Sequence, residues 1–161
     1  MRQTGLFMIL AGMLCCSSAW SDPAAAGIRS ITLKSPVTIP RNHAHLTFQH
    51  GKGASGANLF ETHCEFQVNR VSASPQTVHP GRFIVTRSNQ RVVSDELSGS
   101  FFDLFNCNEP RFYEVHMWLS DPQQPNVRKM ICRNGYPYCG TVEFPNIGTI
   151  SEALGRQFSI E

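Results

Sequence analysis

The chain has 161 residues with 14 basic and 12 acidic residues, and its formal net charge is +2. This length suits one domain better than two. A charge so close to zero excludes a strong general attraction to nucleic acid or to anionic lipid as the main activity, so we expect no nucleic-acid partner.

The first 21 residues have the features of a signal peptide. Arg2 gives a positive start, residues 6–14 are apolar but too short for a permanent membrane helix, and Ala19-Trp20-Ser21 fits the small-x-small rule of signal peptidase. We expect cleavage after Ser21, with a later cut after Ala26 as an alternative. The expected location is therefore periplasmic or secreted.

Cys15 and Cys16 raise the rival prediction of a lipoprotein signal. Met13 and Leu14 argue against it, because they place bulky side chains where lipoprotein peptidases prefer small ones. No later segment is apolar over about 18 residues, so we expect no transmembrane segment in the mature chain.

The mature domain keeps an even set of cysteines: Cys64, Cys107, Cys132 and Cys139. In an exported chain this set predicts two disulfides. The favoured pairing joins Cys64 to Cys132 on apolar strand phases and Cys107 to Cys139 in loops. The alternative joins Cys64 to Cys107 and Cys132 to Cys139. No CxxC pair exists, which argues against thiol redox catalysis and against a four-cysteine zinc site.

Residues 22–30 are expected to form a flexible amino-terminal arm, and strand signals begin at Ile31. Residues 37–49 and 60–71 alternate between apolar and polar side chains, as half-buried strands do. In the second of these segments Cys64 lies on the inward phase and His63 on the outward phase. The glycine-rich residues 51–57 between them predict a flexible connection.

Further strands are expected at residues 82–87, 91–93, 113–119 and 127–133, with a turn at Asn89-Gln90 between the first two. Residues 100–105 fit either one helical turn or a short buried strand. Met117 and Met130 fall on apolar phases and are expected in the core.

One helix is expected near the carboxyl end. The segment from Thr149 to Glu152 matches a capping box with Thr149 at the N-cap, and Gly155 suits the end of the helix. Phe158 and Ile160 predict a last short strand. Together these elements predict a mainly all-β fold, a small antiparallel sandwich or partly open barrel with one short C-terminal helix. Residues 31–161 would form this single disulfide-stapled domain.

The order of several short motifs resembles a loosely defined group of small exported proteins of Gram-negative bacteria. The motifs are Val37-Thr38-Ile39-Pro40, Phe48-Gln49-His50-Gly51, Cys64-Glu65-Phe66, Pro80-Gly81-Arg82-Phe83 and Thr149-x-x-Glu152-Ala153-Leu154-Gly155. The resemblance covers most of the mature chain and implies a fold and an exported location. The group has no established activity, so the resemblance implies no functional residue.

Histidines suggest one site. His43 and His45 lie two apart on an expected strand, so their side chains would leave one face about 7 Å apart. This spacing suits Zn or Cu with a third ligand from a neighbouring strand, for which His63 and His116 are the candidates. Apart from this possible metal, we expect no cofactor.

No catalytic motif is present: the chain lacks a Gly-x-Ser-x-Gly elbow and a phosphate-binding loop. The first hypothesis is therefore a non-catalytic exported domain that binds a protein or an envelope component. Trp118, Tyr136 and Tyr138 are its candidate contact residues, because aromatic side chains anchor interfaces. The alternatives are a periplasmic metal-binding module, an inhibitor of a secreted hydrolase that uses the loop from Tyr136 to Tyr138, and a hydrolase acting at the envelope.

Overall fold

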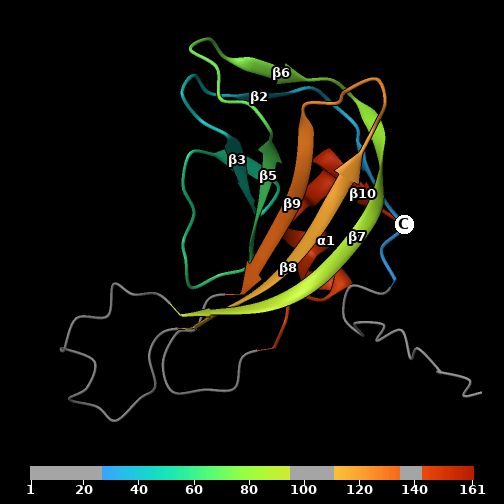
Figure 1. Ribbon diagram of the computed structural model, residues 1–161. Coiled ribbons are helices and arrows are strands. Elements are labelled where there is room, and N and C mark those ends of the chain that lie inside the picture. Colours follow the sequence, from blue (N-terminus) through green and yellow to red (C-terminus); the bar gives the residue numbers. More distant parts are fainter. Residues whose placement is uncertain (1–26, 95–110, 135–142) are drawn as a thin grey trace, which may run out of the picture.

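The computed structural model describes residues 27–94, 111–134 and 143–161. Most of these residues form an open, strongly curled antiparallel half-barrel, which confirms the expected mainly β fold and selects the partly open barrel over the sandwich (Figure 1). The expected signal peptide, most of the expected arm, residues 100–105, and both Cys107 and Cys139 lie outside the described residues. Ile28 is already buried and a strand starts at Ser30, so the ordered domain begins slightly earlier than predicted.

The half-barrel is one eight-stranded sheet. Its strands are β1 (Ser30–Leu33), β3 (His45–Gln49), β4 (Lys52–Ala54), β5 (His63–Val68), β7 (Gly81–Ser94), β8 (Arg111–Ser120), β9 (Val127–Asn134) and β10 (Phe158–Ile160). Their order is β10-β1-β7-β8-β9-β5-β3-β4, and every neighbouring pair is antiparallel. A small second sheet pairs β2 (Val37–Ile39) with β6 (Gln76–Val78).

Three local predictions are wrong, each for a backbone reason. The expected strand at 37–49 is divided into β2 and β3, because Asn42 takes a positive φ of 62° and turns the chain. The expected turn at Asn89-Gln90 is absent, since β7 pairs continuously with β8 beyond its bulge at Val85–Arg87. The expected flexible connection begins instead with a tight turn at His50 and Gly51, both of positive φ, followed by β4.

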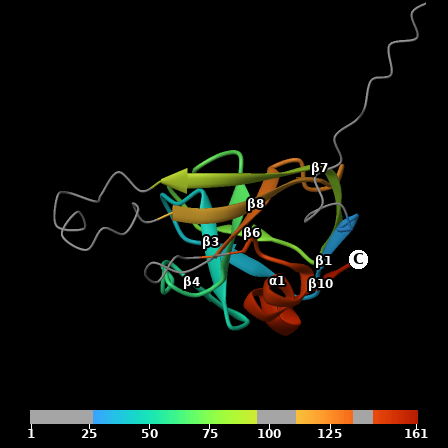
Figure 2. The same ribbon diagram turned by 90° about the horizontal axis from the view of Figure 1, so that it is seen from below.

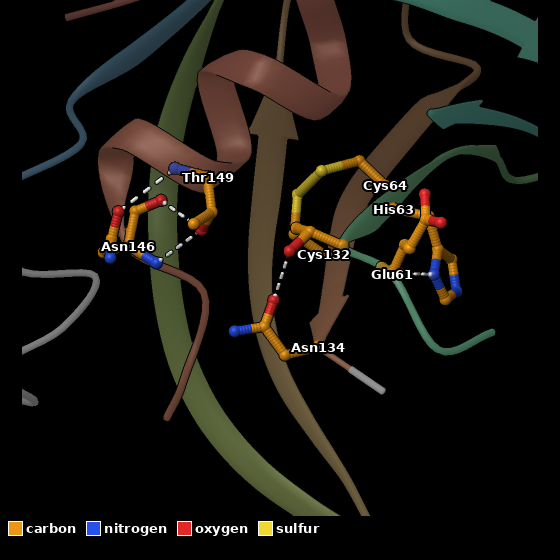
Figure 3. The surroundings of a disulfide bond; sticks show 8 residues. Glu61, His63, Cys64, Cys132, Asn134, Asn146 and Thr149 are labelled. Carbon is orange, nitrogen blue, oxygen red and sulfur yellow. Dashed lines mark hydrogen bonds between the residues drawn. A yellow bond between two sulfur atoms is a disulfide. The ribbon is translucent and has the colours of Figure 1, made fainter. Parts of the chain in front are cut away.

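The curled sheet wraps around α1 (Ile147–Leu154), which supplies Ile150, Ala153 and Leu154 to the core. The N-cap lies three residues before the predicted one: Asn146 caps the helix, and Thr149 is the other member of the box, with reciprocal bonds of 3.1 Å (Figure 3). An Asn is as good an N-cap as a Thr, and its oxygen satisfies a free backbone donor of the first turn.

Gly155 ends α1 as predicted, and β10 follows the short 3-10 turn Gly155–Gln157. The same glycine lets the hairpin turn between β3 and β4 approach the helix end. The amide of Gly51 donates to the carbonyl of Ala153 at 3.0 Å, and a Cβ on Gly155 would lie only 2.4 Å from the Cα of Gly51. Two glycines facing each other therefore permit this contact, which a side chain at either position would obstruct.

Cys64 and Cys132 lie directly opposite each other on β5 and β9 and form a disulfide, the pair favoured from the sequence (Figure 3). Both are fully buried in the core cluster, together with the expected core residues Met117 and Met130. The alternative prediction, in which Cys64 pairs with Cys107, is therefore wrong.

We expect the Cys64→Ala/Cys132→Ala variant to lose about 2–4 kcal/mol of unfolding free energy, because the bond closes a chain segment with a sequence separation of 68 residues. Urea unfolding followed by circular dichroism measures this loss. Wild-type protein in a strong thiol reductant should show a similar loss. An unchanged unfolding midpoint in both samples would contradict a stabilising role for this disulfide.

Candidate functional site

The sheet has one face that turns away from α1 (Figure 2), and the strand register places many polar residues on it. We call it the outer face and define it by twelve residues on four strands: Arg87, Asn89 and Arg91 on β7, Glu114, His116 and Trp118 on β8, Lys129, Ile131 and Arg133 on β9, and His63, Glu65 and Gln67 on β5. The strand register aligns these residues in rows, so that Arg87, Trp118 and Lys129 lie side by side across three strands.

Arg133 forms the centre of the outer face. Its Nε donates to Glu114 Oε1 and its Nη1 donates to Glu65 Oε1, both at 2.5 Å. Gln67 extends the chain of bonds by donating to Glu65 Oε2 at 2.8 Å. One guanidinium thus links three neighbouring strands and offsets part of the negative charge of two carboxylates whose side chains are only 7% and 13% exposed.

His116 continues the network from Glu114. Its Nε2 lies 2.6 Å from Glu114 Oε2, and its Nδ1 lies 3.4 Å from the Nζ of Lys129. The ionised carboxylate can only accept and the ammonium can only donate, so the geometry selects a neutral ring that carries its proton on Nε2. Both ring nitrogens are therefore occupied.

The electrostatics agree with this assignment. Burial lowers the pKa of His116 below its ordinary value of 6.5 and outweighs the hydrogen bond to Glu114. Burial alone would raise the pKa of Glu114, but the bond from His116 and the charge of Arg133 reverse the direction and lower it. Burial and the charge of nearby Arg128 lower the pKa of Lys129.

Trp118 forms the aromatic part of the outer face. The guanidinium carbon of Arg87 lies 3.8 Å from the centre of its ring, and the Nζ of Lys129 lies 5.6 Å away. The ring of His116 is tilted by 31° at 5.9 Å. These are cation–π distances, so the two cations and the half-buried indole hold one another in place.

The four candidate metal ligands are not brought together. His43 precedes β3 and donates from Nδ1 to the carbonyl of Arg41, although its ring does lie 6.5 Å from that of His45. His63 donates to the carbonyl of Glu61 (Figure 3). Within the described part of the chain, no group of three or more potential ligands is placed to hold a metal.

His63, Glu114 and His116 lie on the polar phases of their strands but are not exposed to solvent. They are only 1–5% exposed. The strand register places Trp118 on the outer face. Helix α1 packs against the opposite face of the sheet (Figure 2). Tyr136 and Tyr138 lie outside the described residues.

Two surface features were missed from the sequence. Leu59 and Phe60 are 50% and 58% exposed on the loop before β5, where Asn58 is bonded to Gln49 and Glu61. A hollow also lies between the loops after β5 and β8, lined by Asn69, Arg70, Val71, Ser72, Gln76, Pro125 and Asn126. Its amide groups largely bond to one another or to the nearby backbone, so few are available to a ligand.

Comparison with known proteins found no matching family model, curated protein or solved structure. No helix within residues 27–94, 111–134 and 143–161 has the length and apolar character needed to cross a membrane.

We expect Arg133→Met to lower the unfolding free energy by about 3 kcal/mol, because it leaves two largely buried carboxylates without their cation. Chemical unfolding measures the loss. Arg128→Met, at an exposed position of the same strand, is the matched control and should cost little. The double variant Arg133→Met/Glu114→Gln should recover part of the loss, and a double variant no more stable than Arg133→Met would contradict this account.

The lowered pKa of His116 predicts a pH-dependent stability. Below pH 6.5 the unfolded chain binds a proton at this histidine more readily than the folded chain, so stability falls as the pH drops through that window. Glu114 adds a further loss below pH 4.5. In His116→Gln the unfolding free energy should change less between about pH 6.5 and about pH 5 than in the wild type. His43→Gln, at an exposed position, should keep the wild-type slope, and equal slopes in all three proteins would refute the prediction.

Proposed function

We propose that this chain is an exported, non-catalytic β domain that binds an envelope or secreted protein through the outer face around Trp118. Export is supported by the leader-like residues 1–21 and by the buried disulfide, since disulfides persist mainly in oxidising compartments.

The single observation that carries the binding proposal is the row formed by Arg87, Trp118 and Lys129. Tryptophan and arginine are the residue types most enriched among interface residues that dominate binding energy. Here the two are already stacked at 3.8 Å on a central pair of strands, so binding would cost little additional side-chain ordering.

The same network argues against a catalytic role for this face. A general base needs a nitrogen or oxygen that is free to take a proton from a substrate. Both nitrogens of His116 are engaged, by Glu114 and Lys129, and Arg133 bonds both Glu114 and Glu65.

Site-specific crosslinking in the producing cell tests the proposal. A photoreactive residue at Ile84, which is 49% exposed on β7 near Arg87, should give a covalent adduct with one envelope or secreted protein. The adduct should weaken in an Arg87→Ala background. The same photoreactive residue at exposed Thr38, on the small second sheet, is the matched control and should not give that adduct.

Two results would contradict the proposal. One is a protein with an intact amino terminus and free Cys64 and Cys132 thiols in the cytosol. The other is an Ile84 adduct pattern that the Arg87→Ala substitution leaves unchanged in a folded protein.

A further inference from the structure

We infer that the segment bound by the outer face is an acidic peptide, extended along β7 so that its carboxylates meet Arg87 and Arg91. The inference rests on the proposed function and specifies the chemistry of the partner at the same surface.

The first argument is the charge balance of the outer face. Arg133 uses its guanidinium on both Glu114 and Glu65, the two carboxylates present among the twelve outer-face residues. Arg87, Arg91 and Lys129 consequently form no ion pair with any described residue. A carboxylate-bearing partner would find two arginines, Arg87 and Arg91, that no acidic side chain of the described surface pairs with, whereas Lys129 is already bonded to His116 and lies in the field of Glu114 and Glu65.

The spacing of these cations selects an extended ligand. Arg87 and Arg91 are four residues apart on one strand, or about 13 Å, and Arg87 and Lys129 are two strands apart, or about 10 Å. A single phosphate or carboxylate is much smaller than the backbone spacing of the two arginines along β7. In an extended peptide, side chains at positions i and i+4 leave the same face at the spacing of the two arginines.

The aromatic residue argues against stacked ligands. Binding of single-stranded nucleic acid uses aromatic faces on which bases stack. The guanidinium of Arg87 already lies at stacking distance from the ring of Trp118, and the side chains of His116 and Lys129 lie close to the same ring. A base or a sugar ring would have to displace these groups.

Two neighbours favour a peptide over other polyanions. Asn89 lies between the two arginines on β7. Its side-chain oxygen Oδ1 is buried and has no hydrogen-bond partner among the described residues. Rotation of this amide toward the solvent would therefore break no hydrogen bond at Oδ1. This oxygen could then accept from a peptide N–H, a donor that inorganic polyphosphate lacks. Ile84, half exposed on the same strand, offers an apolar contact for a peptide side chain.

The test is a nuclear magnetic resonance titration of the mature domain with a peptide of about eight glutamates, long enough to span both arginines. Amide shifts should be concentrated on β7, β8 and β9, and a glutamine peptide of the same length should bind more weakly. In Arg87→Gln/Arg91→Gln the dissociation constant should rise about three- to tenfold, the range expected for two exposed ion pairs. Arg41→Gln/Arg70→Gln, which removes the same charge from exposed positions elsewhere, should leave the constant nearly unchanged.

Three results would overturn the inference: equal binding of the two peptides, equal weakening by the two double variants, or tighter binding of polyphosphate or phosphatidylglycerol vesicles at the same residues. An Ile84 crosslink to a protein partner, without glutamate-peptide binding, would refute the acidic peptide while leaving the proposed function intact. Peptide binding without any crosslinked partner would instead count against the proposed function.

Discussion

The organisation of the outer face depends on the bidentate use of Arg133. A single guanidinium between Glu114 and Glu65 joins β8, β9 and β5 on the side of the sheet without a helix. Carboxylates this poorly exposed stay ionised only when a cation and hydrogen bonds replace the water they lose. With Arg133 in place, Glu114 remains an acceptor, and this fixes the tautomer of His116 through the Nε2 bond.

The same bond determines which charges remain available. Since Arg133 bonds both outer-face carboxylates, Arg87 is left to stack on the ring of Trp118, whereas Lys129 bonds to His116 and lies near the same ring. A neutral His116 between Glu114 and Lys129 also adds no positive charge beside the ammonium. Protonation of that ring would place two cationic donors 3.4 Å apart, which explains why burial and Lys129 act on its pKa in the same direction.

Much of the fold could be predicted from the sequence, because local patterns determine it. Alternation placed Cys64, Met117 and Met130 on the inner face, and like environments favoured the Cys64–Cys132 pair. The turn at Asn42 and the unbroken β7 could not be predicted, since they depend on φ and on pairing with β8. The outer network was missed because phase alone shows that Glu114 is polar and outward, whereas the network depends on the pairing of β8 with β9 and of β9 with β5, whose Glu65 is 68 residues from Arg133.

The two faces of the sheet reinforce each other at one position. Cys64 and Cys132 join β5 to β9 on the inner face, and the next residue on each strand, Glu65 and Arg133, joins them on the outer face. Because side chains alternate along a strand, a disulfide inside and an ion pair outside can share one register without competing for space. Two strands joined on both faces resist a shift of their pairing register. A shift of one residue would move the outer side chains of the shifted strand to the core face. A surface built next to such a junction holds Trp118 and its cations in a fixed geometry, and this preorganisation is what the proposed binding of an acidic peptide would require.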